Sequence, residues 1–267
     1  MLNLPLLKRT VKAGGKKWLI FTGLLTLQLL LVLGIYKTGT GTQRGFMSGG
    51  MSEKVAAVFG IGAETDTLTE YLCFHLYRFF IPVLSMIYAC LTANQLMAQK
   101  VESKEMVYLL TTPNKRRCIA NTQAYFLIMS LFLMFFYITI LGIICCAFCF
   151  PGKFEIVPFV LLNIGGFCLL LCLSGISFLA SCISDECRIS LLTGTGICIL
   201  FLLLRMMANI GGVLELLKFT TVFTLFDIEG ILEGNLNICW QFPLLAVSGF
   251  LFYRAGIRLF EKRDLPV

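Results

Sequence analysis

Six long apolar runs constrain this chain more than any other feature of its sequence. About 20 apolar residues in a helix cover the hydrocarbon core of a bilayer, which is about 30 Å thick. Only α-helices and closed β-barrels satisfy all their backbone polar groups in lipid, and runs this long exclude short alternating barrel strands. The expected spans are Trp18–Tyr36, Phe74–Leu96, Ile119–Cys149, Val157–Ser181, Ile189–Asn209 and Cys239–Leu259. We therefore predict an all-α, polytopic membrane protein with six transmembrane helices in a single domain over residues 1–267.

The composition agrees with this class. The chain is 58% apolar and 14% charged, whereas about 25% of the residues of an ordinary soluble domain are charged. The first run is longer than the apolar core of a signal peptide, and the "GIYKTGTG" that follows has no small-x-small cleavage site. We expect this run to remain as a membrane helix.

The basic residues predict the topology. With six spans, fifteen of the twenty-two Lys and Arg residues fall in the two terminal segments and in the second and fourth loops. Short cytoplasmic segments carry an excess of Lys and Arg, so we expect both termini in the cytoplasm. The net charge of +7 then indicates topology and contact with anionic membrane lipids. Because no aromatic residues interleave with the basic ones, it does not indicate nucleic-acid binding.

The segments outside the spans predict several further elements. Residues 1–17 combine leucines with basic residues, which suits either an interfacial elbow helix that turns at Gly14–Gly15 or a frayed basic tail. Residues 38–70 and 210–238 are expected outer loops. Pro82 should kink the second span. The small residues of "NIGG" at 163–166 and "TGTG" at 193–196 should let helices approach closely. "SDECR" at 184–188 is either a second cytoplasmic contact or a solvated turn.

The sequence offers little for catalysis. It has no GxxxxGK[ST] phosphate loop and no HExxH metal motif, and its fifteen carboxylates all fall in loops or at span edges. An acid-based intramembrane mechanism would need ionisable groups at mid-membrane depth. His75, the single histidine, lies at the outer edge of the second span without an evident nucleophile or acid, which favours a structural role. We therefore expect no enzyme activity and no cofactor in this chain.

The twelve cysteines favour packing over chemistry. Most of them lie within spans, where a thiol behaves as a small apolar group, and no disulfide framework is implied. Cys145, Cys146 and Cys149 in "CCAFC" could bind a soft ion such as copper(I), but no second cluster has ligand spacing.

Arg78 and Arg205 are the two costly charges, since both fall within the outer parts of spans. They either extend along the helix to the membrane surface or line an outward cavity and meet an acidic group. Glu215, Asp227 and Glu229 are the candidate partners.

The densest polar patch is "ESKEMVYLLTTPNKRR", residues 102–117, between the second and third spans. So charged a segment cannot cross the bilayer, so we predict a helix over 100–112 on the cytoplasmic surface. Thr112 and Pro113 would begin the third span, because Thr is a good N-cap and Pro is tolerated at the first helical position. Three basic residues in the first turn of that span lie at the positive end of the helix dipole, where positive charge is unfavourable. This indicates that they contact lipid phosphate, nearby acids or a partner.

This patch resembles the coupling helix of type-two ABC exporter permeases, the transmembrane subunits of bacterial ABC transporters. "FTLFDIEGILEGN" at 223–235 is similar to that family's outer loop before the last span, and "YRAGIRLFEKRDLPV" is similar to its C-terminus. The resemblance covers nearly the whole chain. It implies a bacterial plasma-membrane permease that forms a dimer with a second permease copy, either identical or a paralogue. Each copy would dock on a separate ATP-binding cassette ATPase subunit that binds ATP and Mg.

The resemblance also implies roles for single residues. Met106, Leu109 and Leu110 would fill a groove on the ATPase. Thr112 and Pro113 would hold the angle between the coupling helix and the third span. The register of the coupling helix on the ATPase would be set by the charges of Glu102, Glu105, Lys115 and Arg116.

The expected function is export of an amphipathic cargo, such as an antimicrobial peptide or a hydrophobic small molecule. The alternative is a non-transporting membrane sensor or adaptor that binds a cytoplasmic partner through the same patch. An intramembrane enzyme is disfavoured by the missing acids.

Overall fold

The computed structural model describes residues 3–37, 68–106, 116–151, 154–209, 221–232 and 240–263. Within these ranges the chain is helical and has no strand, as predicted. Six helical stretches are long and apolar enough to cross a membrane, and each overlaps one predicted span: Leu4–Lys37, Leu68–Glu102, Arg116–Cys149, Ile156–Ile183, Cys187–Ala208 and Gln241–Lys262. The prediction of an all-helical chain with six helices long and apolar enough to span a membrane is therefore confirmed for the described residues.

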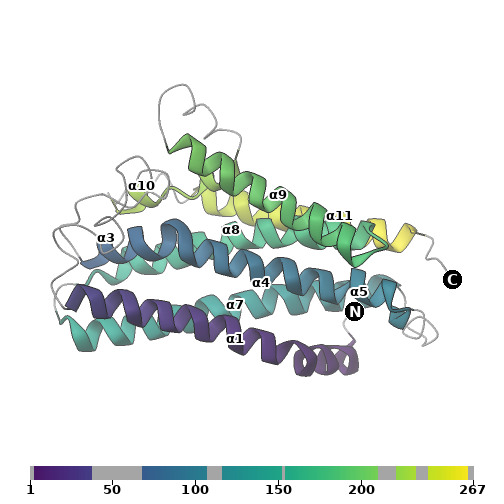
Figure 1. The fold of residues 1–267 in the computed structure, drawn as a ribbon, viewed down its shortest axis with the longest axis horizontal. Coiled ribbons are helices and arrows are strands. Elements are labelled where there is room, and N and C mark those ends of the chain that lie inside the picture. Colours follow the sequence, from purple (N-terminus) through teal and green to yellow (C-terminus); the bar gives the residue numbers. More distant parts are fainter. Residues whose placement is uncertain are drawn as a thin grey trace.

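The long helices lie side by side in one elongated bundle (Figure 1). Five of the stretches are single helices, namely α1 (Leu4–Lys37), α7 (Arg116–Cys149), α8 (Ile156–Ile183), α9 (Cys187–Ala208) and α11 (Gln241–Lys262). The second consists of α3 (Leu68–Leu72), the π-helix η2 (Cys73–Phe80), α4 (Ile81–Leu96) and α5 (Ala98–Glu102). Both chain ends and α5 lie at one end of the bundle, here called the terminal end. At the opposite end lie α3, the 3-10 helix η4 (Val222–Leu225) and α10 (Ile228–Leu232).

Helix α8 packs against α4, α7, α9 and α11, and glycines bring it close to two of them. A Cβ added to Gly175 would lie 2.9 Å from the Gly249 carbonyl oxygen of α11, and one added to Gly194 of α9 would lie 3.2 Å from Ser177 Cα. Side chains crowd Gly165 and Gly166 in the same way, whereas Gly196 has no such neighbour within 4 Å. The small-residue motifs therefore do mark close helix approaches, at three of their four glycines.

The predicted disturbance at Pro82 takes the form of a π-helix. The Ile81 N–H bonds to the Leu76 carbonyl, five residues back, at the end of η2. A proline ring crowds the carbonyl four residues before it and offers no N–H. Wider π-turns directly before Pro82 fit this requirement, and such bulges are frequent at functional sites.

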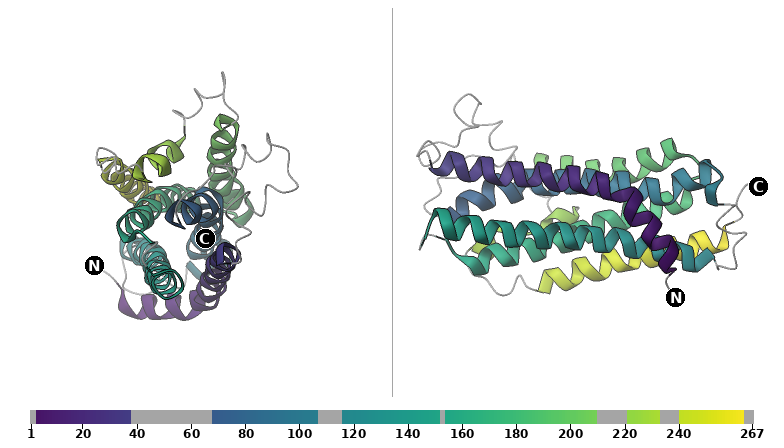
Figure 2. Two further views of the ribbon diagram at one scale, coloured as in Figure 1. Left: turned by 90° about the vertical axis from the view of Figure 1, so that its left-hand side faces the viewer. Right: turned by 90° about the horizontal axis from the view of Figure 1, so that it is seen from below.

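The predicted elbow over residues 1–17 is not a separate helix, because α1 continues from Leu4 to Lys37. Figure 2 shows that α1 bends, so that its N-terminal part lies across the neighbouring helices. A Cβ on Gly14 would lie 2.8 Å from Phe126 Cζ of α7. Gly14 thus serves a close contact between helices inside a continuous helix.

The predicted helix over 100–112 is interrupted. Helix α5 ends at Glu102, and Lys104 has a φ of 58°, a left-handed conformation that non-glycine residues seldom adopt. The Lys104 N–H bonds to the Val101 carbonyl at 3.1 Å, which closes the end of α5. A short helical segment resumes at Glu105, and residues 107–115 lie outside the described ranges, as does the predicted start of the third span at Pro113.

Candidate functional sites at the two ends of the bundle

At the terminal end, the Glu102 carboxylate reaches the start of α9. The Cys187 backbone N–H donates to Glu102 Oε2 at 2.9 Å. The first N–H groups of a helix have no partner within the helix, and the N-cap residue Glu186 makes no side-chain cap. Glu102 therefore caps α9 from another part of the chain, and it joins the end of α5 to the "SDECR" turn.

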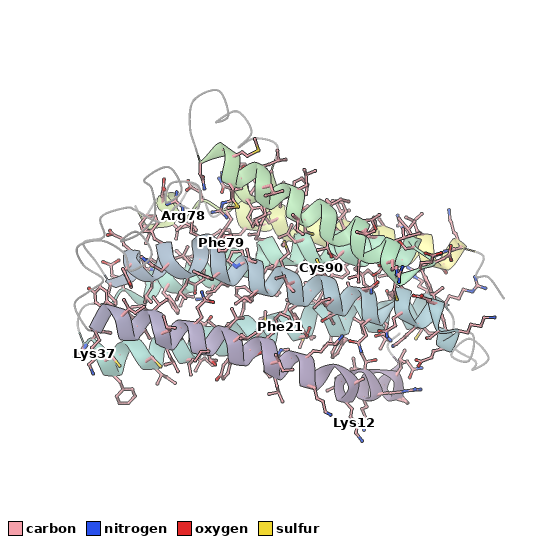
Figure 3. All side chains as sticks on the ribbon, viewed as in Figure 1. Lys12, Phe21, Lys37, Arg78, Phe79 and Cys90 are labelled. Atoms are coloured by element: carbon pink, nitrogen blue, oxygen red, sulfur yellow. The ribbon has the colours of Figure 1, made fainter. Side chains whose placement is uncertain are left out.

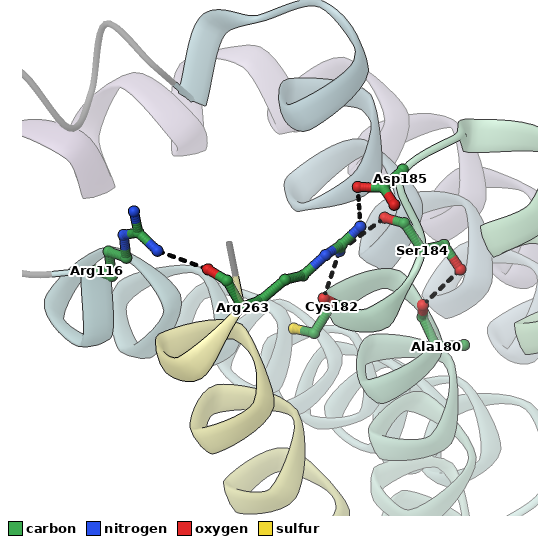
Figure 4. A network of polar contacts seen from close by, with 6 residues as sticks. All are labelled: Arg116, Ala180, Cys182, Ser184, Asp185 and Arg263. Carbon is green, nitrogen blue, oxygen red and sulfur yellow. Dashed lines mark hydrogen bonds and ion pairs between the residues drawn. The ribbon is translucent and has the colours of Figure 1, made fainter. Parts of the chain in front are cut away.

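Arg263 ties the end of α11 to the same turn (Figure 4). Its Nη1 donates to the carbonyls of Cys182 at 2.9 Å and Ser184 at 3.1 Å, and its Nη2 pairs with Asp185. Arg116 Nη1 donates to the Arg263 carbonyl at 2.6 Å. The "SDECR" turn is therefore bound within the chain, and the first turn of α7 is bound to the end of α11.

The residues predicted to couple to an ATPase have different surroundings. Glu105 is exposed, as a docking residue must be, but Met106 is only 1% exposed and packs in the cluster that contains Leu96 and Ile119. Met106 therefore does not have a free side chain with which to fill a groove on a partner, because its own bundle covers it. The other predicted members lie outside the described residues: Leu109, Leu110, Thr112, Pro113 and Lys115.

At the opposite end, Arg78 and Arg205 line one cavity of about 300 Å³. Arg78 Nη2 lies 3.4 Å from Glu229 Oε1, so one of the three predicted acidic partners pairs with it. Asp227 lines the same cavity, while Glu215 lies outside the described residues. Figure 3 shows Arg78 at the end of the bundle away from Lys12. The two arginines therefore line one cavity, while its predicted outward orientation stays a prediction.

The two guanidinium groups differ in their pairing. Arg205 Cζ lies 5.2 Å from the centre of the Phe223 ring, and its buried Nη1 has no hydrogen bond to the described residues. Arg78 lies over Phe74 at 5.3 Å as well as beside Glu229, which is 63% exposed at the side chain. A guanidinium that is stacked on a ring and keeps a free donor is suited to bind a carboxylate or phosphate. The cavity can therefore receive an anionic group.

His75 and the cysteines of "CCAFC" are the two remaining candidates from the sequence. The Nδ1 atom of His75 lies 3.0 Å from the Tyr71 carbonyl oxygen, and the His75 ring stacks on the Tyr71 ring at 4.1 Å. In the part of the chain that the structure describes, no group of three or more His, Cys, Asp or Glu residues could hold a metal ion. Of the "CCAFC" thiols, Cys146 is buried and Cys149 is exposed.

No family model matches this chain, and neither a curated protein nor a solved structure matches it. The sites are therefore interpreted from their own chemistry and from the resemblance in the sequence.

Proposed function

We propose that this protein is the membrane-spanning subunit of an ATP-driven exporter of the type-two ABC class. A partner ATPase docks at the terminal end and binds ATP and Mg, and two permease copies form the translocation path. The proposal is supported by the position of the described residues on either side of 107–115 in "ESKEMVYLLTTPNKRR". These residues, in α5 and at the start of α7, lie at the terminal end of the bundle.

The contacts at this end supply a route for coupling. Glu102, the first residue of the motif, bonds to the start of α9. Arg116, near the end of the motif, bonds to the end of α11, which Arg263 ties to the α8–α9 turn. A displacement imposed on the residues between Glu102 and Arg116 would therefore act on the second span and on α7, α8, α9 and α11. These contacts are a physical basis for transmitting ATPase movement. Because the helix breaks at Lys104, the movement would not pass through a single rigid helix.

The proposed cargo is an amphipathic peptide or a hydrophobic small molecule that moves out of a bacterial cell with both permease termini in the cytoplasm. Its apolar part would contact the helix faces, and an anionic group would meet the free donor of Arg205 at the opposite end. Exposed apolar side chains on α9, such as Leu192 and Leu203, would face lipid or the second copy.

The test is co-expression of the chain with a P-loop ATPase encoded beside it, followed by co-purification and ATP hydrolysis in lipid nanodiscs. We expect Leu109→Asp combined with Leu110→Asp to insert normally, to lose the ATPase and to lose export. Lys12→Asp is the control, because it places an acid at an exposed position of α1 at the same end, and it should keep both the ATPase and export. Retention of ATPase and export by the double variant would refute the docking proposal. If the double variant loses the partner but the wild type shows no cargo-stimulated ATP hydrolysis, the sensor or adaptor function would be favoured.

A further inference from the structure

A second cavity, of about 280 Å³, lies at the terminal end between the N-terminal part of α1, the α4–α5 segment and α7. Arg9 lines it from α1, and Lys100 lines it from α5. Gln95 and Gln99 add amide groups. This is the place where the bend of α1 brings its first turns across the bundle (Figure 2).

A buried hydroxyl in its wall lacks a hydrogen-bond partner. Thr92 is 3% exposed and lines the cavity, and its Oγ1 has no hydrogen bond to the described residues. The Tyr88 hydroxyl lies near Thr92 and Ser130, but neither the Tyr88 nor the Thr92 hydroxyl makes a hydrogen bond of good geometry to the described residues. A buried polar group without a partner costs free energy, so it indicates a polar ligand.

The charges around the cavity select the type of ligand. Arg9 and Lys100 repel each other and Glu105 attracts Lys100, so these three side chains act on one another. Two positive charges and one negative charge leave a net +1. Among phosphate groups, a diester carries a single negative charge, whereas a monoester carries about −1.5 to −2 at neutral pH.

The position of the cavity indicates a lipid source. On α1 the exposed side chains change from basic to apolar just beyond the cavity, from Lys12 and Lys16 to Leu19 and Ile20. A helix that crosses a membrane changes in this way at the depth of the lipid headgroups. The α1 residues that line the cavity lie between Leu6 and Gly14, on the basic side of this boundary.

We propose that this cavity binds the phosphodiester of an anionic phospholipid. Arg9 and Lys100 pair with the phosphate oxygens, and Thr92 and Gln95 donate hydrogen bonds to them. The bound lipid holds the bent part of α1 against α4 and α7. This site does not depend on the proposed transport function, because it requires only this chain and a lipid.

The experiment is native mass spectrometry of the full chain with phosphatidylglycerol and, in parallel, with phosphatidylcholine, which has the same diester but no net charge. Wild-type protein should retain phosphatidylglycerol preferentially. Lys100→Gln should weaken this retention by about tenfold or more, as expected for the loss of a charged hydrogen bond. Lys100→Arg should preserve it. Lys12→Gln removes the same charge from α1 outside the cavity and is the matched control.

Thr92→Val gives a second measure that leaves the net charge unchanged, and we expect it to weaken retention about fivefold. Equal losses in Lys100→Gln and Lys12→Gln would indicate diffuse surface attraction and would overturn the site. Equal retention of the two lipids would also overturn it. Glycerophosphoglycerol, the same diester without acyl chains, and inorganic phosphate form the soluble arms. If either bound as tightly as the lipid, the ligand would be a soluble phosphate rather than a membrane lipid.

Discussion

The contact between α8 and α11 at Gly249 permits a sharp test of the bundle. A Cβ at Gly249 would lie 2.9 Å from both the carbonyl carbon and the carbonyl oxygen of Leu171. Favourable contacts between carbon atoms lie at about 3.5–4.0 Å. Gly249→Ala therefore requires the two helix backbones to separate by about 0.6 Å or more, because a backbone cannot turn aside as the end of a side chain can.

The magnitude follows from two opposing effects. Overpacking of this kind costs about 1–3 kcal/mol, while Gly→Ala inside a helix gains about 0.8–1.0 kcal/mol in water. Gly196→Ala on α9 is the matched control, since nothing lies within 4 Å of its added Cβ. Because both variants share the helix-propensity gain, the difference between them isolates the packing cost. We expect Gly249→Ala to be less stable than Gly196→Ala by about 1–3 kcal/mol.

The assay is unfolding by increasing SDS fraction in mixed micelles, followed by circular dichroism and by the fluorescence of Trp18 and Trp240. The free energies of unfolding of wild type and of both variants are compared at one SDS fraction. Equal stability of the two variants, or a more stable Gly249→Ala, would show that α8 and α11 do not approach closely enough for the added methyl group to clash.

Three further predictions concern the two ends of the bundle. Arg263→Ala should lower the free energy of unfolding by about 1.5–3 kcal/mol and should speed proteolysis at the 184–188 turn, because Arg263 binds this turn at two points and the end of α8 at a third. The exposed Arg258→Ala is the control, and equal proteolysis of both variants would contradict the tie. Arg205→Met should change the free energy of unfolding by less than about 1 kcal/mol or raise it, since a buried, incompletely paired charge stabilises little, yet it should reduce cargo-stimulated ATP hydrolysis; a large loss of stability would mean that Arg205 is structural. Glu102→Ala should accelerate hydrogen exchange of the Cys187 amide, which loses its acceptor, whereas Glu105→Ala should leave this rate unchanged; the same exchange rate in both would exclude the cap.

The long elements and some of the close contacts could be predicted because their causes are local. Apolar runs of about 20 residues produce spanning helices wherever they occur. The "NIGG" and "TGTG" motifs pointed to close packing, but only the assembled bundle distinguishes Gly194, which meets Ser177, from Gly196, which meets nothing. Glu229 was one of three possible partners of Arg78, and only the placement of α10 selected it.

The contacts at the terminal end could not be predicted. Glu102 and Cys187 are separated by 85 positions, and Arg263 and Cys182 by 81. No spacing rule relates such residues, so Glu102 and Arg116 looked like groups free for a partner. Met106 was predicted to lie on a surface helix over 100–112, but the helix breaks at Lys104 and Met106 is buried.

By itself, the sequence determined the class of the protein, the number of its long helices and the location of its polar patch, because hydropathy and charge act over one helix at a time. Only the tertiary structure decided which charges pair, where α1 bends and which polar groups gather in the two cavities. Those features depend on distances between helices that are far apart in the chain, and packing sets these distances.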